Sequence, residues 1–179
     1  MAETLKNSES LVYRCRIFDV YEADVKLPNG RLVKQTRIEH KPTIAVVPID
    51  EKGNLILLNQ FRSALNRNLL EIPAGSLDTE ESIEACVQRE LAEEAGYQAD
   101  RLIKLFEGYL VPGYCNEYMH FFLALDLFEK SLPPDEDEVI EIVRIPFDEA
   151  LCMIERGEIV DAKTALGIVL ARNYLSQSK

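Results

Sequence analysis

The chain has 179 residues, of which 47% are hydrophobic, so it is long enough to bury one substantial core but short for two full domains. Its formal net charge of −11 argues against non-specific nucleic-acid binding, which depends on a basic surface. The N-terminus is polar and contains acids, and no apolar run is long enough to cross a bilayer, so we expect a cytoplasmic protein with no membrane contact. The four scattered cysteines form no C-x-x-C pair, so we expect them to be reduced.

The charge is divided unevenly along the chain. Residues 1–70 contain 11 Lys and Arg against 8 Asp and Glu, whereas residues 71–179 contain 9 against 23. The first part therefore offers positive groups to an anion, and the second offers negative groups to a cation. A solvated acidic surface would give the same counts, so the pattern alone does not decide between them.

The first 40 residues are predicted to form a β segment. Two β-rich runs, at 11–27 and 31–40, surround Pro28-Asn29-Gly30, a sequence typical of a hairpin turn. Because an isolated hairpin buries too little surface to be stable, this segment must pack on the main body or on a second chain. We therefore divide the chain into an N-terminal β segment, 1–40, and a main domain, 41–179.

The next part of the chain alternates buried strands with turns and then changes period. Residues 43–50 and 54–61 are predicted to be two buried strands, and 69–75 a short strand that ends at a proline and a glycine. Residues 79–95 are predicted to form a helix, because Asp78 and Glu81 have the spacing of a capping box and Gly96 is the residue type that commonly follows a helix end.

The remaining pattern predicts three strands and two helices. The strands are expected at 101–110, 118–127 and 138–145, and the helices at 147–157 and 161–177. Strands, one helix, more strands and two closing helices predict an α/β (α+β) fold, in which helices pack on a mixed sheet.

The predicted helix 79–95 carries Glu90, Glu93 and Glu94 within one sector, beside an apolar stripe. Like charges at this spacing repel one another, and a hard divalent cation such as Mg²⁺ would turn that repulsion into binding. Arg89 precedes Glu93 by four residues and is well placed to pair with it. On these residues alone, a solvated helix face remains the commoner explanation.

The sequence around this helix resembles the Nudix box. From Gly75 the chain has five residues, Glu81, seven residues and then RELAEEAGY, which matches the box at each fixed position, with Tyr97 where the family more often has an aliphatic residue. The resemblance implies a mixed-sheet α/β/α sandwich, here with an N-terminal antiparallel hairpin as an extension. It also implies divalent-metal-dependent hydrolysis of a diphosphate linked to another moiety.

Carried over position by position, the resemblance implies roles for the box residues. Glu90 and Glu94 would be direct ligands of Mg²⁺, with Mn²⁺ as an alternative, and the backbone carbonyl of Ala74 would be a third ligand. Glu93 would be a further ligand or an outer base. The residues that support the site would be Glu81, Arg89, Gly75 and Gly96.

Further segments, among them NQFR, LLEIPAG and VPGYCNEYMHFFLALDL, are similar to ADP-ribose pyrophosphatases. Pro112 lies sixteen residues beyond Gly96, a spacing associated with that subgroup. The loop after this proline supplies a glutamate in the subgroup, and Glu117 matches it. Glu117 is therefore the candidate general base, with Glu93 and Glu94 as alternatives.

The same resemblance implies contacts with the substrate and a partner. Arg62 matches a family arginine that contacts the substrate, Arg37 is a second candidate, and Phe18 or its neighbours would supply an aromatic face to adenine. Related enzymes are homodimers with shared sites, so we expect a homodimer. Two alternatives stay open: hydrolysis of another nucleoside diphosphate sugar such as GDP-mannose, and a non-catalytic module that senses a nucleotide.

Overall fold

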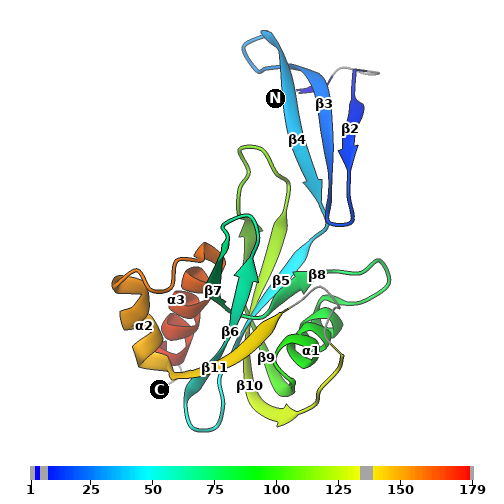
Figure 1. Cartoon of the computed structure of the whole chain (residues 1–179). Helices are drawn as coiled ribbons and strands as arrows, with labels where there is room; N and C mark the ends of the chain where they lie inside the picture. The colour runs from blue at the N-terminus through cyan, green and yellow to red at the C-terminus, as the bar shows by residue number, and fades with distance from the viewer. Residues whose placement is uncertain (1–2, 5–7, 134–138, 178–179) are drawn as a thin grey trace. The chain divides into compact units, whose positions relative to one another are not determined.

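The computed structural model describes residues 3–4, 8–133 and 139–177 (Figure 1). The chain forms two compact units. The first consists of Met1–Pro42 and Gly108–Tyr118, and the second of Thr43–Glu107 and Met119–Lys179. The boundary expected after residue 40 lies close to the end of Met1–Pro42, but no local pattern in the sequence indicates that Gly108–Tyr118 belongs to the same unit.

The first unit is an antiparallel sheet built around β3. Its strands are β1 (Glu3–Thr4), β2 (Ser10–Arg14), β3 (Phe18–Lys26) and β4 (Leu32–His40), and β3 pairs with each of the other three. The predicted hairpin turn is confirmed, since Gly30 has a φ of 83° and β3 pairs with β4 along its whole length. The run 11–27, predicted as one strand, is wrong: the chain reverses after β2, where the Cys15 amide donates to the Phe18 carbonyl at 3.1 Å.

The loop of the first unit is attached to β4 by hydrogen bonds. The Ile38 amide donates to the Tyr114 carbonyl at 2.7 Å, and the Asn116 amide donates to the Ile38 carbonyl at 3.2 Å. The Asn116 side chain also accepts from the His40 amide at 2.8 Å. These contacts fix the loop that carries Glu117 to the N-terminal sheet.

The second unit contains two sheets. The mixed sheet has the order β8-β5-β10-β9, in which β5 runs parallel to β10 and antiparallel to β8. The second sheet has the order β11-β6-β7 and is antiparallel. The strands are β5 (Thr43–Pro48), β6 (Asn54–Arg62), β7 (Arg67–Glu71), β8 (Ala74–Ser76), β9 (Tyr97–Tyr109), β10 (Tyr118–Glu129) and β11 (Ile140–Pro146).

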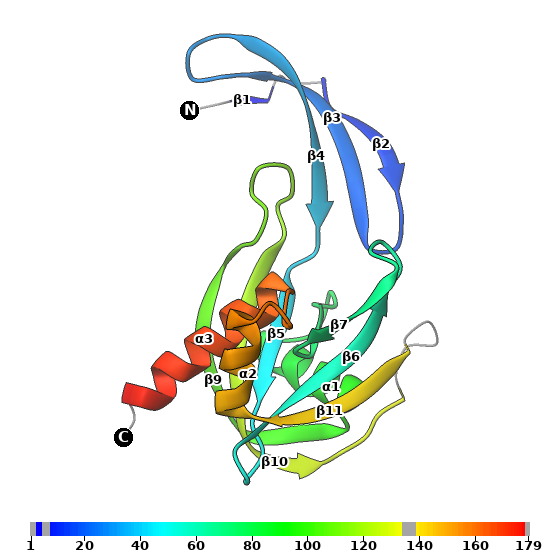
Figure 2. The same ribbon diagram turned by 60° about the vertical axis from the view of Figure 1, so that its left-hand side comes forward.

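Three helices, α1 (Ile83–Glu94), α2 (Phe147–Glu155) and α3 (Ala162–Gln177), complete the second unit. Its strands lie between α1 and the pair α2 and α3 (Figures 1 and 2). Ile44 and Val46 of β5 belong to a core cluster with the apolar face of α1, whereas Val47 lies against α3 at Gly167. Because β5 is covered on both faces, its sequence is continuously apolar rather than alternating. This arrangement is the predicted α/β/α sandwich.

The helix α1 begins later than predicted. Its N-cap is Ser82, whose Oγ accepts from the Ala85 amide at 3.2 Å, so the predicted start at Thr79 is wrong. Glu81 does accept from the Asp78 amide, at 2.9 Å, but this bond closes a turn before the helix. The predicted end is confirmed, since Gly96 follows the helix with a φ of 78°.

The single strand predicted at 69–75 is wrong, because the chain leaves one sheet and enters the other there: β7 ends at Glu71, and β8 begins at Ala74 in the mixed sheet. The remaining elements agree with the prediction to within a few residues, except that β9 begins directly after Gly96. The first residue of the strand expected at 138–145 lies outside the described residues, and β11 begins at Ile140. In the described part of the chain, every helix is too short or too polar to span a bilayer.

Candidate active site

The site is centred on the short strand β8. Ala74 and Gly75 pair with Ala45 and Ile44 of β5, and Glu90 and Glu94 of α1 lie against them. Glu94 Oε2 accepts from the Ala74 amide at 2.8 Å. A Cβ atom added at Gly75 would lie 1.9 Å from Glu90 Oε1, so only glycine leaves room for this carboxylate. Both glutamates are buried, at 9% and 6% exposed.

Arg89 joins the box carboxylates to one another. Its Nη2 and Nε atoms donate to Glu81 at 2.7 and 3.1 Å, and its Nη1 donates to Glu90 at 2.8 Å and to Glu93 at 3.0 Å. The predicted contact between Arg89 and Glu93 is therefore confirmed. The Arg89 guanidinium lowers the pKa of Glu81 to about 2, and the hydrogen bonds to Glu81 are the largest cause of a raised pKa at Arg89.

The predicted ligands Glu90 and Glu93 both form ion pairs with Arg89 Nη1. Across residues 3–4, 8–133 and 139–177, no three His, Cys, Asp or Glu side chains already lie together as a preformed ion site. The metal-binding role of Glu90, Glu93 and Glu94 therefore stays a prediction. The glutamates still fit a divalent cation, because buried carboxylate oxygens beside a strand carbonyl are the donors that Mg²⁺ prefers.

A second charged cluster lies around Glu71 at the end of β7. Arg62 binds its carboxylate through two nitrogens, Nε at 2.7 Å and Nη2 at 2.6 Å, and Lys163 of α3 forms an ion pair with the same carboxylate. Glu71 is only 2% exposed. Burial alone would raise the pKa of Glu71, but the two cations outweigh it and the pKa is lowered.

Arg62 was predicted to contact the substrate, and the structure shows that it also has a protein partner. The hydrogen bonds to Glu71 raise the pKa of Arg62, and the Glu94 carboxylate contributes further. Arg62 thus lies within electrostatic range of a predicted metal ligand. Its side chain is 43% exposed, and its Nη1 atom takes no part in the pair with Glu71.

Sequence reasoning missed Glu71 and Lys163. The available signals were a single carboxylate within the apolar run Leu69–Ile72 and a lysine directly after the first residue of the last helix. Neither signal names its partner, because the two residues are 92 positions apart.

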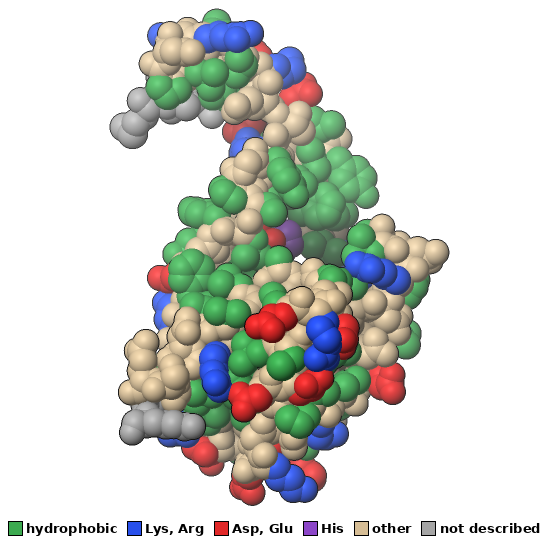
Figure 3. Space-filling model, turned by 90° about the vertical axis from the view of Figure 1, so that its left-hand side faces the viewer, with side chains coloured by type: hydrophobic (Ala, Val, Ile, Leu, Met, Phe, Trp, Pro, Cys, Tyr) green, Lys and Arg blue, Asp and Glu red, His purple; other side chains and the backbone are tan. Residues whose placement is uncertain are grey.

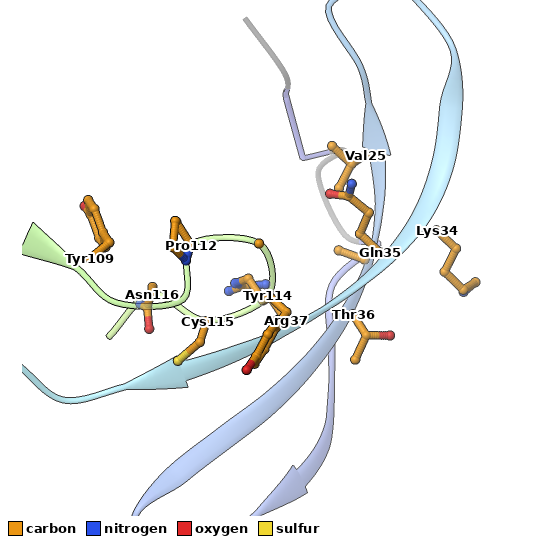
Figure 4. Close-up of a pocket in the computed structure, with 12 residues that line it drawn as sticks. Val25, Lys34, Gln35, Thr36, Arg37, Tyr109, Pro112, Tyr114, Cys115 and Asn116 are labelled. Atoms are coloured by element: carbon orange, nitrogen blue, oxygen red, sulfur yellow. The ribbon is translucent and has the colours of Figure 1, made fainter. Parts of the chain in front are cut away.

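Arg37 lies in the first unit and lines a cavity of about 670 Å³ (Figure 4). The cavity lies between β3 and β4 on one side and the segment that carries Pro112 and Tyr114 on the other. The Arg37 guanidinium stacks over the Tyr21 ring at 4.8 Å and forms an ion pair with Glu9. Arg37 is therefore held in place at the cavity wall.

Glu117 and Phe18 also belong to the first unit, whereas the box carboxylates and Arg62 belong to the second. The Glu117 amide donates to Cys115 Sγ at 3.4 Å, which continues the attachment of this loop to β4. Phe18 is half-buried, and its ring centroid lies 6.5 Å from that of Tyr13. The predicted site residues thus divide between the two units.

The chain is similar to known proteins along most of its length. Residues 39–165 match the family model described as the NUDIX domain. The chain is 39% identical to an ADP-ribose pyrophosphatase of Bacillus subtilis (strain 168), over 88% of this chain and 86% of that protein. It is 41% identical to a GDP-mannose pyrophosphatase of Yersinia enterocolitica, over 82% of each chain.

A solved structure described as an ADP compounds hydrolase has a similar fold. The TM-score is 0.88 at 27% sequence identity, and the match covers 99% of this chain and 95% of that one. The similarity therefore extends well beyond the box, to both units of the chain.

Proposed function

The chain belongs to the Nudix family and is a hydrolase of diphosphate bonds, and we propose that its substrate is ADP-ribose, which it converts to AMP and ribose 5-phosphate. The observation that carries this proposal is the placement of two buried carboxylates, Glu90 and Glu94, against the strand that holds Ala74 and Gly75. Similarity over 88% of the chain to a protein named ADP-ribose pyrophosphatase supports the substrate.

The reaction needs a divalent metal ion, as in Nudix hydrolases generally, and we propose Mg²⁺, which Mn²⁺ can replace. Glu90, Glu94 and the Ala74 carbonyl would hold it, and Glu93 is a further ligand or a base. Such an ion stabilises negative charge on phosphate oxygens and lowers the pKa of a water molecule. Arg89 contributes by fixing the rotamers of Glu90 and Glu93.

Proton removal from the attacking water is assigned to Glu117, with Glu93 and Glu94 as the competing candidates. The support for Glu117 is its loop, which the hydrogen bonds to β4 hold in one conformation. Replacing Glu117 with Gln should lower kcat at least tenfold while Mn²⁺ affinity stays unchanged. A Glu117→Gln variant with full kcat would move the assignment to the box glutamates.

Substrate contacts are assigned to both units. Arg62 in the second unit would bind the diphosphate, because a guanidinium suits phosphate oxygens and Glu71 already holds it in a fixed orientation. Arg37 and Phe18 in the first unit would bind the nucleoside.

The competing substrate is GDP-mannose, since a relative of similar identity carries that name. Steady-state kinetics with ADP-ribose, GDP-mannose and other nucleoside diphosphate sugars, ranked by kcat/KM, test the choice. We expect ADP-ribose to rank first by at least tenfold, and a guanosine compound in first place would contradict the proposal.

We also propose that the protein is a homodimer in which the N-terminal sheets meet. The outer strands of this sheet expose large apolar side chains, among them Val12 and Leu32, each 60% exposed. A second copy of the chain would cover them. Analytical ultracentrifugation of the wild type and of Val12→Asp tests this, with a dimer expected for the first and a monomer for the second.

We place the protein in the cytoplasm. The four cysteines are unpaired, and burial is the largest cause of the raised pKa of the Cys86 thiol, which makes this thiol unreactive. Fractionation of cells that produce the protein, followed by immunoblotting, tests this location.

A further inference from the structure

The start of α3 is locked by one carboxylate. Asp161 Oδ2 accepts from the Thr164 amide at 3.0 Å, from Thr164 Oγ1 at 2.6 Å and from Lys163 Nζ at 2.9 Å. These bonds cap the helix and fix the rotamers of the two residues that follow. The side chains of Lys163 and Thr164 are therefore held in fixed orientations where they contact the core.

These two residues hold two consecutive residues of another segment. Lys163 forms an ion pair with Glu71, and Thr164 Oγ1 accepts from the Ile72 amide at 2.9 Å. Thr164 is fully buried, at 0% exposed. Its hydroxyl donates to Asp161 and accepts from Ile72, so removing it would leave a buried amide without a partner.

The packing of α3 leaves little room for this segment to shift. A Cβ atom added at Gly167 would lie 2.8 Å from Ile72 Cδ1 and 3.1 Å from Val47 Cγ2, so the helix backbone closely approaches both side chains. The Pro73 carbonyl accepts from the Val46 amide at 2.9 Å. The segment is thus held by α3 at Glu71 and Ile72 and by β5 at Pro73.

The segment leads directly into the proposed metal site. Only Pro73 separates Ile72 from Ala74, whose amide donates to Glu94. A displacement of Ile72 by a few tenths of an ångström would therefore move the Ala74 carbonyl relative to the box carboxylates. Mg²⁺ and Mn²⁺ sites are sensitive to such displacements, because residues that orient the direct ligands affect metal affinity by about 10- to 100-fold.

From these contacts we propose that Lys163 and Thr164 are positioning residues for the metal-binding edge at Ala74 and Gly75. The inference rests on the proposed metal site. It adds that α3, which supplies none of the proposed ligands, sets the affinity of that site through Glu71 and Ile72. A role in stability alone would lower the melting temperature of the variants and leave the metal affinity of their folded form unchanged.

The test measures Mn²⁺ binding to the full chain by isothermal titration calorimetry. Thr164→Val removes the hydroxyl at nearly constant shape, and Lys163→Met removes the charge. Thr164→Ser retains the hydroxyl. Arg172→Met, on the same helix, removes a surface ion pair with Asp148. Acidic and basic side chains are interspersed on the surface shown in Figure 3. Circular dichroism establishes that each variant is folded at the titration temperature.

We expect the Mn²⁺ dissociation constant to rise at least tenfold in Thr164→Val and at least threefold in Lys163→Met. In the controls Thr164→Ser and Arg172→Met it should stay within twofold of the wild-type value. Thr164→Val and Lys163→Met should lower kcat for ADP-ribose at a fixed, subsaturating metal concentration more than they raise KM, since Arg62 is retained. Should Thr164→Val not fold, Lys163→Met carries the test.

Unchanged Mn²⁺ affinity in the folded Thr164→Val and Lys163→Met variants would overturn the inference and leave the metal site intact. A wild type that binds no Mn²⁺ would overturn the proposed metal site, and this inference with it.

Discussion

Two charged clusters, the box around Arg89 and the cluster around Glu71, have opposite ratios of acidic to basic side chains. In the box, one guanidinium, Arg89, is shared by Glu81, Glu90 and Glu93. At the end of β7, one carboxylate, Glu71, is shared by Arg62 and Lys163. The first cluster has an excess of negative charge that an added cation would balance, whereas in the second the protein's own cations outnumber the carboxylate.

This difference in charge indicates which cluster would gain free energy from a bound cation. Burying the Glu71 carboxylate costs free energy, and its two cationic partners offset that cost within the fold. The box glutamates repel one another, and Arg89 offsets only part of this repulsion. Binding of a metal ion can therefore remove the rest and stabilise the site. Substitutions around Glu71 should therefore affect stability first and reach the metal site only through Ile72 and Ala74, whereas loss of Glu90 or Glu94 should affect mainly activity.

The largest effect is expected for Glu94→Gln. The amide keeps an oxygen for the Ala74 amide but loses the negative charge, so kcat/KM for ADP-ribose should fall by more than about 100-fold with little change in melting temperature. Glu84→Gln, an exposed position of the same helix, is the matched control and should keep wild-type kinetics. Equal activity of the two variants would remove Glu94 from the mechanism.

The next effect is expected for Glu71→Gln. A neutral amide cannot balance Arg62 and Lys163 in a buried position, so the free energy of unfolding should fall by about 3 kcal/mol, measured by urea denaturation. Glu149→Gln removes a 48% exposed partner of Arg156 and should change stability by less than about 0.5 kcal/mol. Similar losses in both variants would mean that burial of Glu71 is not what makes its ion pairs strong.

Gly75→Ala should have a smaller effect on stability but a clear effect on metal binding. The new methyl group would overlap the Glu90 carboxylate, which must move, at a cost of about 2 kcal/mol. Mn²⁺ affinity, measured by calorimetry, should weaken at the same time. For stability, Gly113→Ala is the control, because a Cβ there meets nothing within 4 Å. A Gly75→Ala variant with wild-type metal affinity would show that Glu90 is not a metal ligand.

The smallest effect is expected for Glu81→Gln, and it should depend on pH. Arg89 lowers the pKa of Glu81 from 4.5 to about 2 in the folded state, so the ionised carboxylate stabilises the fold fully above pH 4.5 and loses this contribution as the pH falls towards 2. Glu81→Gln should cost about 1 kcal/mol at neutral pH. The difference from the wild type, followed by thermal denaturation, should shrink below pH 4.5, and a constant difference would contradict the assigned pKa.

Local features of the sequence were sufficient for several elements. The end of α1 at Gly96, the turn at Gly30 and the burial of β5 each follow from residues that are neighbours in the chain. The start of α1 was missed because Asp78 and Ser82 are both good N-cap residues. Only the bond from the Ala85 amide to Ser82 Oγ shows that the second of them is the N-cap.

The site was predictable where its residues share one helix and unpredictable where they do not. The common sector of Glu90 and Glu94 follows from helical periodicity. The partnership of Glu71 with Lys163 joins distant segments, and so does the attachment of the Asn116 loop to β4. Such pairs depend on how the strands and α3 pack, which no local pattern contains.

The most direct test follows ADP-ribose by ³¹P NMR in the presence of the wild type and of Glu94→Gln, with Mg²⁺ and with a chelator. We expect AMP and ribose 5-phosphate from the wild type with Mg²⁺, and almost no product from the variant or from either protein with the chelator. Wild-type product formed at the same rate with the chelator, or by Glu94→Gln with Mg²⁺, would contradict a reaction that depends on a metal held by the box glutamates.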